Sequence, residues 1–162
     1  MNKNTLPKYI KSYETKIGKL TIGSDDNFIT HIFFYKDKVP ENIEERETAV
    51  IKQEINELNE YFEGKRKNFT VPLNPEGTEF QKKVWKALLN IPYGKTCSYK
   101  DIAEKIGSPK ACRAVGSSNG KNPIPIIIPC HRVINASGNI GGYSAGLDIK
   151  TKLMNIENIK SK

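Results

Sequence analysis

Residues 78–108, TEFQKKVWKALLNIPYGKTCSYKDIAEKIGS, decide the fold of the second half of the chain, because they carry two helix-start signals in close succession. Thr78 is followed three residues later by Gln81, the pattern of a capping box, so a helix is predicted to begin there. Ser98 and Asp101 repeat this spacing and predict a second, shorter helix. The segment is therefore predicted to be two helices with a break between them.

A third helix is expected directly after these two. Ser108 supplies a candidate N-cap and Pro109 a first-turn proline, which predicts a helix at about 109–119. Two short helices joined by a tight turn, here at Gly107–Ser108, are the arrangement of a helix-turn-helix. A final helix is expected at about 148–159, where apolar residues recur at helical spacing.

The first half has a different pattern, in which strands precede a helix. NPEG at 74–77 carries turn residues and marks the expected boundary, so we predict an α/β domain at 1–75 and a mostly α domain at 76–162. Residues 28–35 are apolar on both faces and are expected to form a central strand, in which His31 is a core or edge residue satisfied by a neighbour rather than a ligand. The elements expected in the first half are strands at 9–14, 17–23, 28–35 and 69–73 and a helix at 44–63.

Composition is typical of a globular protein that does not span a membrane. Of the 162 residues 37% are hydrophobic, and no apolar stretch approaches the ~18 residues of a spanning helix. The start of the chain lacks the apolar core of a secretory signal. The expected compartment is therefore the cytoplasm, or the nucleus in a eukaryote.

Charge is distributed unevenly between the two halves. The formal net charge is +8, with 12 basic and 12 acidic residues in 1–75 but 14 basic and 6 acidic residues in 76–162. A basic half favours an anionic partner, and nucleic acid is the first candidate. The alternative is that the excess serves only the solubility of a lysine-rich chain.

Cysteine and histidine spacing bears on metals and disulfides. Cys97, Cys112 and Cys130 contain no C-x-x-C pair, and His31 and His131 stand in no zinc-ligand spacing with them. We therefore expect no disulfide framework, no metal site and no cofactor.

Cys130 is the candidate nucleophile. It lies in NPIPIIIPCHRVI, residues 122–134, which is expected to be extended and buried. A free cysteine titrates near pH ~8.5 unless a neighbouring base or cation raises its thiolate fraction, and His131 and Arg132 follow directly. Adjacent strand residues face opposite sides, so contact with His131 needs a bend after Pro129 or a linking water. The alternative is an inert core cysteine.

Pro-Cys-His-Arg-Val at 129–133 resembles the signature of the O6-alkylguanine-DNA alkyltransferases, also called methylated-DNA–protein-cysteine methyltransferases. Residues 77–103 and 111–147 are similar to the same family in residue type and spacing, whereas 1–75 match only in general character. The resemblance implies a DNA repair protein that moves an alkyl group from the O6 of guanine in double-stranded DNA onto Cys130. Each molecule would act once and need no cofactor.

The resemblance also implies roles for residues around Cys130. His131 would accept the thiol proton through a water, Glu157 would orient His131, and Asn122 would brace the turn that holds the site. Three further residues would line the guanine pocket: Tyr143, Ser144 and Val133.

For DNA binding, the resemblance implies a winged helix-turn-helix that flips the damaged nucleotide out of the duplex. Arg113 would fill the vacated stack, Tyr99 would rotate the 3′ phosphate, and Lys100 would add a DNA contact. Ser108, with the free amides opening the third helix, would hold another phosphate. Without the family, Arg113 is a solvated charge and Tyr99 a half-buried aromatic residue. The first domain would be RNase H-like, and the protein is expected to be a monomer.

Three other functions fit part of the sequence. A non-catalytic alkyltransferase-like protein would bind the lesion, but that class lacks the reactive cysteine and Cys130 is present. A winged-helix regulator would explain the basic half but gives Pro-Cys-His-Arg no purpose. A cysteine hydrolase using Cys130 and His131 would turn over, whereas a transferase stops after one equivalent.

Overall fold

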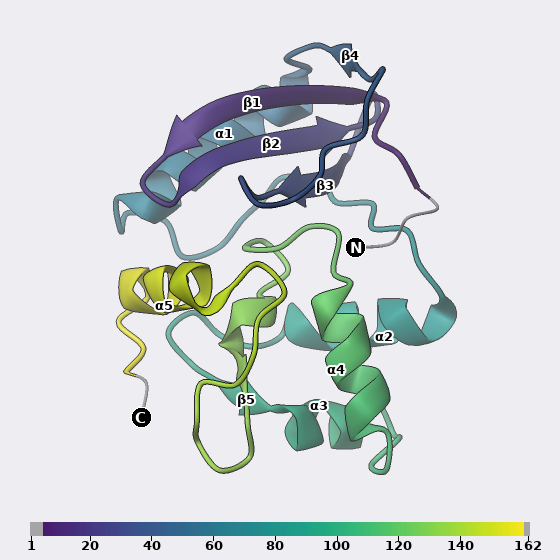
Figure 1. Ribbon diagram of the computed structural model, residues 1–162, viewed down its shortest axis with the longest axis vertical. Coiled ribbons are helices and arrows are strands. Elements are labelled where there is room, and N and C mark those ends of the chain that lie inside the picture. Colours follow the sequence, from purple (N-terminus) through teal and green to yellow (C-terminus); the bar gives the residue numbers. More distant parts are fainter. Residues whose placement is uncertain (1–4, 161–162) are drawn as a thin grey trace. The chain divides into compact units, whose positions relative to one another are not determined.

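The computed structural model describes residues 5–160, and these form two compact units (Figure 1). The first unit ends at Glu76 and the second begins at Gly77. Among the described residues, no helix is long and apolar enough to cross a membrane.

A four-stranded sheet and one helix make up the first unit. Its elements are β1 (Tyr9–Thr15), β2 (Gly18–Ser24), β3 (Ile29–Phe33), β4 (Glu44–Glu45) and α1 (Ala49–Phe62). The first three strands are antiparallel and β4 pairs in parallel with β1, so the strand order is β3-β2-β1-β4. Helix α1 packs against β2 and β3 (Figure 1). The three long strands predicted from the sequence are confirmed.

The prediction that 28–35 form a central strand is wrong, because β3 lies at the edge of this sheet. On its outer side only Ile29 pairs: its N–H donates to Pro72 O and its carbonyl accepts from Asn74 N, both at 2.9 Å. Residues 69–73, expected as a strand, contribute no more than this isolated bridge. An apolar pattern reports which faces of a strand are covered, and it carries no information about how many edges are paired.

His31 is a buried residue of β3, as predicted. It is 3% exposed, and its ring stacks on Phe33 with the centroids 5.4 Å apart. Its Nδ1 lies 2.8 Å from Thr30 Oγ1. Burial lowers the pKa of His31 to about 4, so the ring is neutral at physiological pH.

Helix α1 begins after the predicted residue 44, because β4 occupies that position. Thr48 is the N-cap, and its Oγ1 accepts from Ile51 N at 3.2 Å. The helix ends as predicted before Gly64, whose φ of +75° favours glycine. Its buried face anchors it on the sheet and includes Ile51, Leu58 and Phe62 of the predicted stripe.

The second unit is mostly α. Its elements are α2 (Glu79–Leu88), β5 (Cys97–Ser98), α3 (Tyr99–Lys105), α4 (Cys112–Gly120), the 3-10 helix η1 (Cys130–Arg132), β6 (Val133–Ile134) and α5 (Leu147–Ile156). Helices α2, α3 and α4 pack on one another (Figure 1). Strands β5 and β6 pair in parallel as a small two-stranded sheet.

Both predicted capping patterns are confirmed. Thr78 Oγ1 accepts from Gln81 N at 3.1 Å, and Gln81 Oε1 accepts from Thr78 N at 3.0 Å. At the start of α3, Ser98 Oγ accepts from Asp101 N at 3.0 Å and Asp101 accepts from Ser98 N at 2.9 Å. These contacts span three residues, so they follow from local sequence alone.

The predicted start of the third helix is wrong, since α4 begins at Cys112 and not at Pro109. Ser108 belongs to the end of α3, where its N–H donates to the Ala103 carbonyl at 2.9 Å. Its own carbonyl accepts from Ala111 N at 2.9 Å and closes a turn. Ser108 therefore ends one helix instead of capping the next, and the free helical amides predicted beside it lie further along the chain.

Residues 122–134 are buried, but they are not extended as expected. An isolated bridge joins Pro125 to Ile128, and Ile126 between them has a φ of +75°. The three isoleucines at 126–128 are at most 6% exposed. A β-branched residue in the left-handed region is held there by its surroundings, so this turn is a strained support for the Cys130 segment.

Glu54 in α1 is a buried carboxyl group without a hydrogen bond. It is 0% exposed, and neither carboxylate oxygen has a hydrogen-bond partner among residues 5–160. Burial raises its pKa well above 4.5, the nearby charge of Glu57 adds to the rise, and Arg66 opposes it. The folded protein therefore keeps Glu54 protonated at pH values where the unfolded chain has lost that proton.

We predict that the Glu54→Gln substitution stabilises the first unit at high pH. Because the folded state binds the extra proton, wild-type stability falls as pH rises above about 4.5. The variant should match the wild type at pH 4 and have the larger free energy of unfolding at pH 8, with the difference growing as pH rises. Urea unfolding across this range measures the effect, with the exposed Glu41→Gln as control. Parallel pH profiles for wild type and Glu54→Gln would contradict the prediction.

Candidate active site

Cys130 opens η1, a single turn of 3-10 helix, so the chain bends after Pro129. This bend is one of the two arrangements that the sequence allowed. Cys130, His131 and Arg132 are 3%, 0% and 6% exposed. With three residues per turn, successive side chains point about 120° apart, so the three buried side chains leave the turn in different directions.

His131 is held by Glu157. Its Nε2–H donates to Glu157 Oε2 at 2.6 Å, and both side chains are fully buried. Burial lowers the pKa of His131, although Glu157 acts against this, and the imidazole is neutral at pH 7. With the proton on Nε2, Nδ1 is an acceptor, and it has no hydrogen-bond partner among residues 5–160. The site thus contains an oriented base with an open lone pair.

Glu157 accepts hydrogen bonds from two separate segments, η1 and the turn after α2. Besides His131, it accepts from Arg132, with Nε at 2.8 Å from Oε1 and Nη2 at 3.2 Å from Oε2. The backbone N–H of Gly94, from the turn after α2, also donates to Oε1 at 3.1 Å. Glu157 itself is the C-cap residue of α5. A buried carboxylate is tolerated when several donors satisfy it, as these do.

Arg132 does not serve the thiol as the sequence suggested. Its guanidinium turns to Glu157, and its Nη1 donates to the Ile91 carbonyl at 2.7 Å. Arg132 therefore holds the last helix and the 91–95 turn around η1. Adjacency in sequence does not bring the guanidinium to Cys130, because the 3-10 turn sends it in another direction.

The Cys130 thiol lies among groups that favour its charged form. Burial raises the pKa of Cys130, while hydrogen bonding to Tyr143 and Asn122 and the charge of Lys150 oppose the rise. Tyr143 Oη is 3.4 Å from the Cys130 sulfur. Burial and then the charge of Cys130 raise the pKa of Tyr99, so this phenol is near enough to respond to the thiolate. The net result is a thiol that needs a base to react.

Two asparagines support the turn that presents Cys130. Asn122, 6% exposed, donates from Nδ2 to the Ile128 carbonyl at 2.8 Å and accepts at Oδ1 from Ile124 N at 2.9 Å. Asn119, at the end of α4, donates to the Cys130 carbonyl at 3.4 Å. Asn122 was a predicted site residue, whereas Asn119 was not. No pattern in the sequence around Asn119 signals this contact.

Lys150 in α5 is a second residue that the sequence analysis missed. Its side chain is fully buried, and its ammonium group donates to three carbonyls: Val133 O at 2.7 Å, Ile140 O at 2.5 Å and Gly142 O at 3.1 Å. Burial lowers its pKa to about 8, so the charge is present at pH 7. A lysine three residues before Leu153 falls on the apolar stripe of the helix, and this was the available signal.

The residues expected to form the guanine pocket are spread over two segments. Val133 is fully buried in β6. Tyr143 is half-buried and Ser144 exposed in the glycine-rich loop at 138–146, whose carbonyls Lys150 holds. Lys150 also binds the Val133 carbonyl, so a single ammonium group joins both segments.

The residues expected to contact DNA lie on α3, α4 and the turn between them. Arg113 is exposed on α4, and Lys100 is exposed near the start of α3. Tyr99 opens α3 and is half-buried, with its ring next to Gly116, where an added Cβ would lie 3.9 Å from it. Ser108 is half-buried in the turn. Trp85 Nε1 donates to Ser118 O at 2.8 Å and fixes α4 on α2.

The described part of the chain contains no cluster of side chains that could bind a metal ion. Among residues 5–160, no three histidine, cysteine, aspartate or glutamate side chains are placed to hold one ion. Cys97, Cys112 and Cys130 are all free thiols.

The second unit holds a buried cysteine next to a neutral histidine that is bound to a carboxylate. This arrangement is typical of proteins that use cysteine as a nucleophile. Family comparison gives the particular member of this class. The 6-O-methylguanine DNA methyltransferase DNA binding domain matches residues 79–159, and the ribonuclease-like domain of the same family matches residues 8–75. The chain belongs to the 6-O-methylguanine DNA methyltransferase family, which confirms the resemblance seen in the sequence.

Individual relatives match over nearly their whole length. A methylated-DNA–protein-cysteine methyltransferase of Methanosarcina acetivorans is 47% identical, with 92% of this chain and 97% of the relative covered. The constitutive enzyme of that name from Bacillus subtilis is 44% identical, over 95% of this chain and 98% of its own. The crystal structure of Mycobacterium tuberculosis OGT in complex with DNA has a TM-score of 0.87 at 42% identity, with 92% of each chain covered.

We predict that the Lys150→Met substitution loosens the glycine-rich loop. Three carbonyls lose their shared donor, and a buried acceptor left unpaired costs about 1–3 kcal/mol. Amide hydrogen exchange at 138–146 should accelerate by at least about tenfold, while exchange in α2 stays unchanged. The matched control is Lys152→Met, which removes an exposed lysine from the same helix. Equal loop exchange in both variants would show that Lys150 does not hold the loop.

Proposed function

We propose that this protein repairs DNA by transferring an alkyl group from the O6 of guanine directly to the sulfur of Cys130. The observation that carries the proposal is the buried Cys130 turn, with Glu157 holding His131 so that Nδ1 is an open acceptor. Family membership agrees with this chemistry.

The transfer is a single displacement. The Cys130 sulfur attacks the alkyl carbon, an S–C bond forms, and the C–O6 bond breaks with its electron pair moving to the guanine, which takes up a proton. The thiol proton passes to His131 Nδ1 through a water. His131 becomes an imidazolium that Glu157, 2.6 Å away, stabilises. Because burial raises the pKa of the thiol, attack is coupled to this proton transfer. The same raised pKa suppresses alkylation of Cys130 by other reagents when no substrate is bound.

The product makes the reaction irreversible. A thioether has no labile proton or good leaving group, and the site offers no nucleophile positioned to remove the alkyl group from sulfur. Each molecule therefore reacts once, which separates this proposal from a cysteine hydrolase. No metal or organic cofactor takes part, since the acceptor is the protein's own sulfur.

The guanine pocket is formed by Val133, Tyr143 and Ser144. Tyr143, 3.4 Å from the sulfur, sits where it meets both the thiol and the incoming base. Asn122 braces the turn below through its bonds to Ile124 and Ile128. Lys150 acts as a positioning residue, because it fixes both walls of the pocket without being exposed to the substrate.

DNA binds to the α3–α4 side of the second unit, which acts as a winged helix-turn-helix. The target base sits inside a duplex and must leave the stack to reach a buried thiol. Arg113 on α4 occupies the space it vacates, Tyr99 turns the 3′ phosphate, and Lys100 and Ser108 contact the backbone. Asn119 links α4 to the Cys130 carbonyl, so the helix that holds the duplex also fixes the nucleophile. The first unit is an RNase H-like domain.

The working form is a monomer, because one unit carries both the nucleophile and the DNA contacts. The proposed compartment is the one that holds the chromosome, which is the cytoplasm or, in a eukaryote, the nucleus.

We predict that Cys130→Ala abolishes alkyl transfer and preserves DNA binding. The thiol supplies the chemistry, whereas affinity comes from α3 and α4. The test incubates each protein with duplex DNA containing O6-[methyl-³H]guanine and counts protein-bound label, with Cys112→Ala, an exposed thiol on α4, as the matched control. Wild type and control should take up one methyl group per molecule and the variant none. Label on Cys130→Ala would overturn the assignment, and release of label with turnover would indicate a hydrolase.

We predict that Arg113→Ala slows repair of duplex DNA even at saturating protein. If the guanidinium replaces the flipped base, its loss lets the base restack, an effect of a few kcal/mol, so the maximal rate should fall by roughly tenfold to a hundredfold. Reaction with free O6-benzylguanine needs no flipping and should change little. Lys121→Ala removes an equal charge from the other end of α4 and serves as control. An undiminished saturated rate would reduce Arg113 to a simple electrostatic contact.

A further inference from the structure

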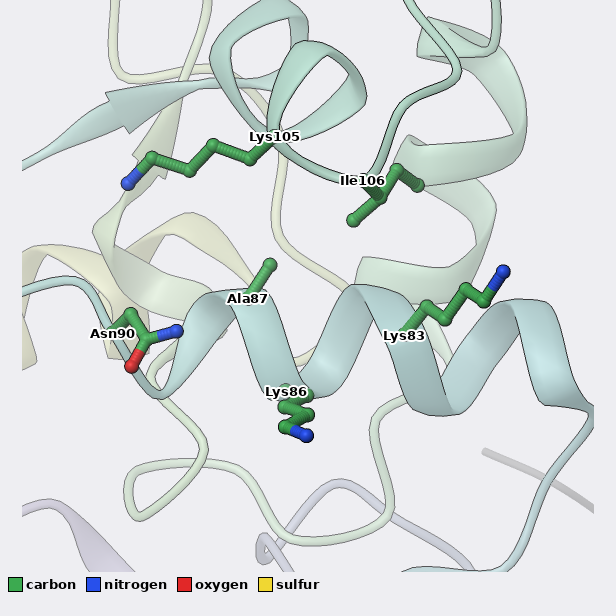
Figure 2. Close-up of a pocket in the computed structure, with 6 residues that line it drawn as sticks. All are labelled: Lys83, Lys86, Ala87, Asn90, Lys105 and Ile106. Carbon is green, nitrogen blue, oxygen red and sulfur yellow. The ribbon is translucent and has the colours of Figure 1, made fainter.

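A basic groove runs between α2 and the end of α3, away from the cysteine site. Its volume is about 420 Å³, and it is lined by Lys83, Lys86, Ala87 and Asn90 of α2 and by Lys105 and Ile106 at the end of α3 (Figure 2). None of these residues belongs to the reactive turn, the pocket loop or the DNA contacts proposed above. The groove therefore has no part in the proposed reaction.

The three lysines of the groove bear unneutralised charge. Within residues 5–160 none of them forms an ion pair, and all three are exposed. Lys105 interacts with Asp101, whose pKa it helps to lower, but the Asp101 carboxylate is already bound as part of the cap of α3. Three cations within one groove attract anions.

The layout of the groove suits a chain of phosphates better than a single anion. Lys83, Lys86 and Lys105 point in different directions and do not converge on one point (Figure 2). Ala87 is 8% exposed and forms an apolar floor with Ile106, while Asn90 adds an amide at one end. Spaced charges over an apolar floor match a nucleic-acid backbone, in which phosphates alternate with sugar carbons.

The groove and α4 lie on different sides of α2. On a helical wheel, Lys83, Lys86, Ala87 and Asn90 share one stripe. Trp85, which bonds to Ser118 of α4, points to the other side of the helix. A strand in the groove and a duplex on α4 would therefore be two separate stretches of nucleic acid.

We infer that the α2–α3 groove binds the phosphate backbone of a second DNA segment, so that one molecule holds two segments at once. Three lysine–phosphate contacts provide the affinity, which is independent of base sequence and sensitive to salt. The inference goes beyond the proposed repair reaction and rests on the proposed binding of a duplex at α4.

The test follows backbone amide shifts of the ¹⁵N-labelled full chain by NMR during titration with an undamaged 12-base-pair duplex. Amides of the groove residues should shift in addition to those of α4, with a separate binding curve. In the triple variant Lys83→Gln, Lys86→Gln, Lys105→Gln the groove shifts should disappear and the α4 shifts remain. A plot of log affinity against log salt concentration for the groove should fall with a slope of about −0.9 for each lysine–phosphate contact.

A second readout measures bridging. Two duplexes carrying donor and acceptor dyes should show energy transfer when wild-type protein is added, and the triple variant should lower this transfer by at least about tenfold. The control is Lys11→Gln, Lys19→Gln, Lys38→Gln, which removes the same charge from the first unit. Methyl transfer to Cys130 serves as a check that both variants are folded.

Four results would overturn the inference. Shifts confined to α4 in the wild type would show that the groove does not bind DNA. Equal groove shifts with millimolar inorganic phosphate would make it a small-anion site, and a marked preference for an RNA duplex would assign it to RNA. Equal loss of bridging in the triple variant and its control would attribute the effect to net charge alone.

Discussion

The second unit depends on one buried carboxylate. Glu157 accepts four hydrogen bonds from the His131 ring, the Arg132 guanidinium and the Gly94 backbone, and it stands at the end of α5. Three stretches of chain far apart in sequence thus meet at two oxygen atoms. A buried charge is costly unless its donors are all in place, so the arrangement is close to all-or-none. His131, the proposed base beside Cys130, is oriented by the same contact that joins these three stretches.

A second buried charge completes the site from the opposite direction. Lys150 donates to carbonyls of β6 and the glycine-rich loop, and its charge favours the Cys130 thiolate. Glu157 and Lys150 both belong to the last helical segment, seven residues apart on the same side of the helix. One segment therefore positions the proposed base with its carboxylate and the proposed pocket with its ammonium group. In the proposed reaction the reactivity of Cys130 comes from this arrangement and not from an unusually acidic thiol, because burial keeps the Cys130 pKa raised.

Helix α4, the proposed DNA-binding helix, is joined to the Cys130 turn and to α2 by single hydrogen bonds. Trp85 fastens α4 to α2, and Asn119 fastens the end of α4 to the Cys130 carbonyl. In the proposed reaction, the helix that holds the duplex is therefore tied directly to the turn that carries the sulfur. The same packing leaves the α2–α3 groove on another side of α2, so the proposed second DNA segment would bind there without contacting α4.

Local sequence determined the elements whose stabilising contacts span only a few residues. Patterns within a few neighbouring residues predicted the capping boxes at Thr78 and Ser98, the end of α1 at Gly64 and the three long strands. The Cys130–His131 pair was visible in the same way, and the family signature added Glu157. Tertiary structure decided the rest: the edge position of β3, the use of Ser108 to end α3, the turn of Arg132 toward Glu157, and the burial of Lys150. In each of these cases the deciding partner lies on another segment or depends on a bend of the backbone, and hydrophobic period and capping patterns carry no information about such partners.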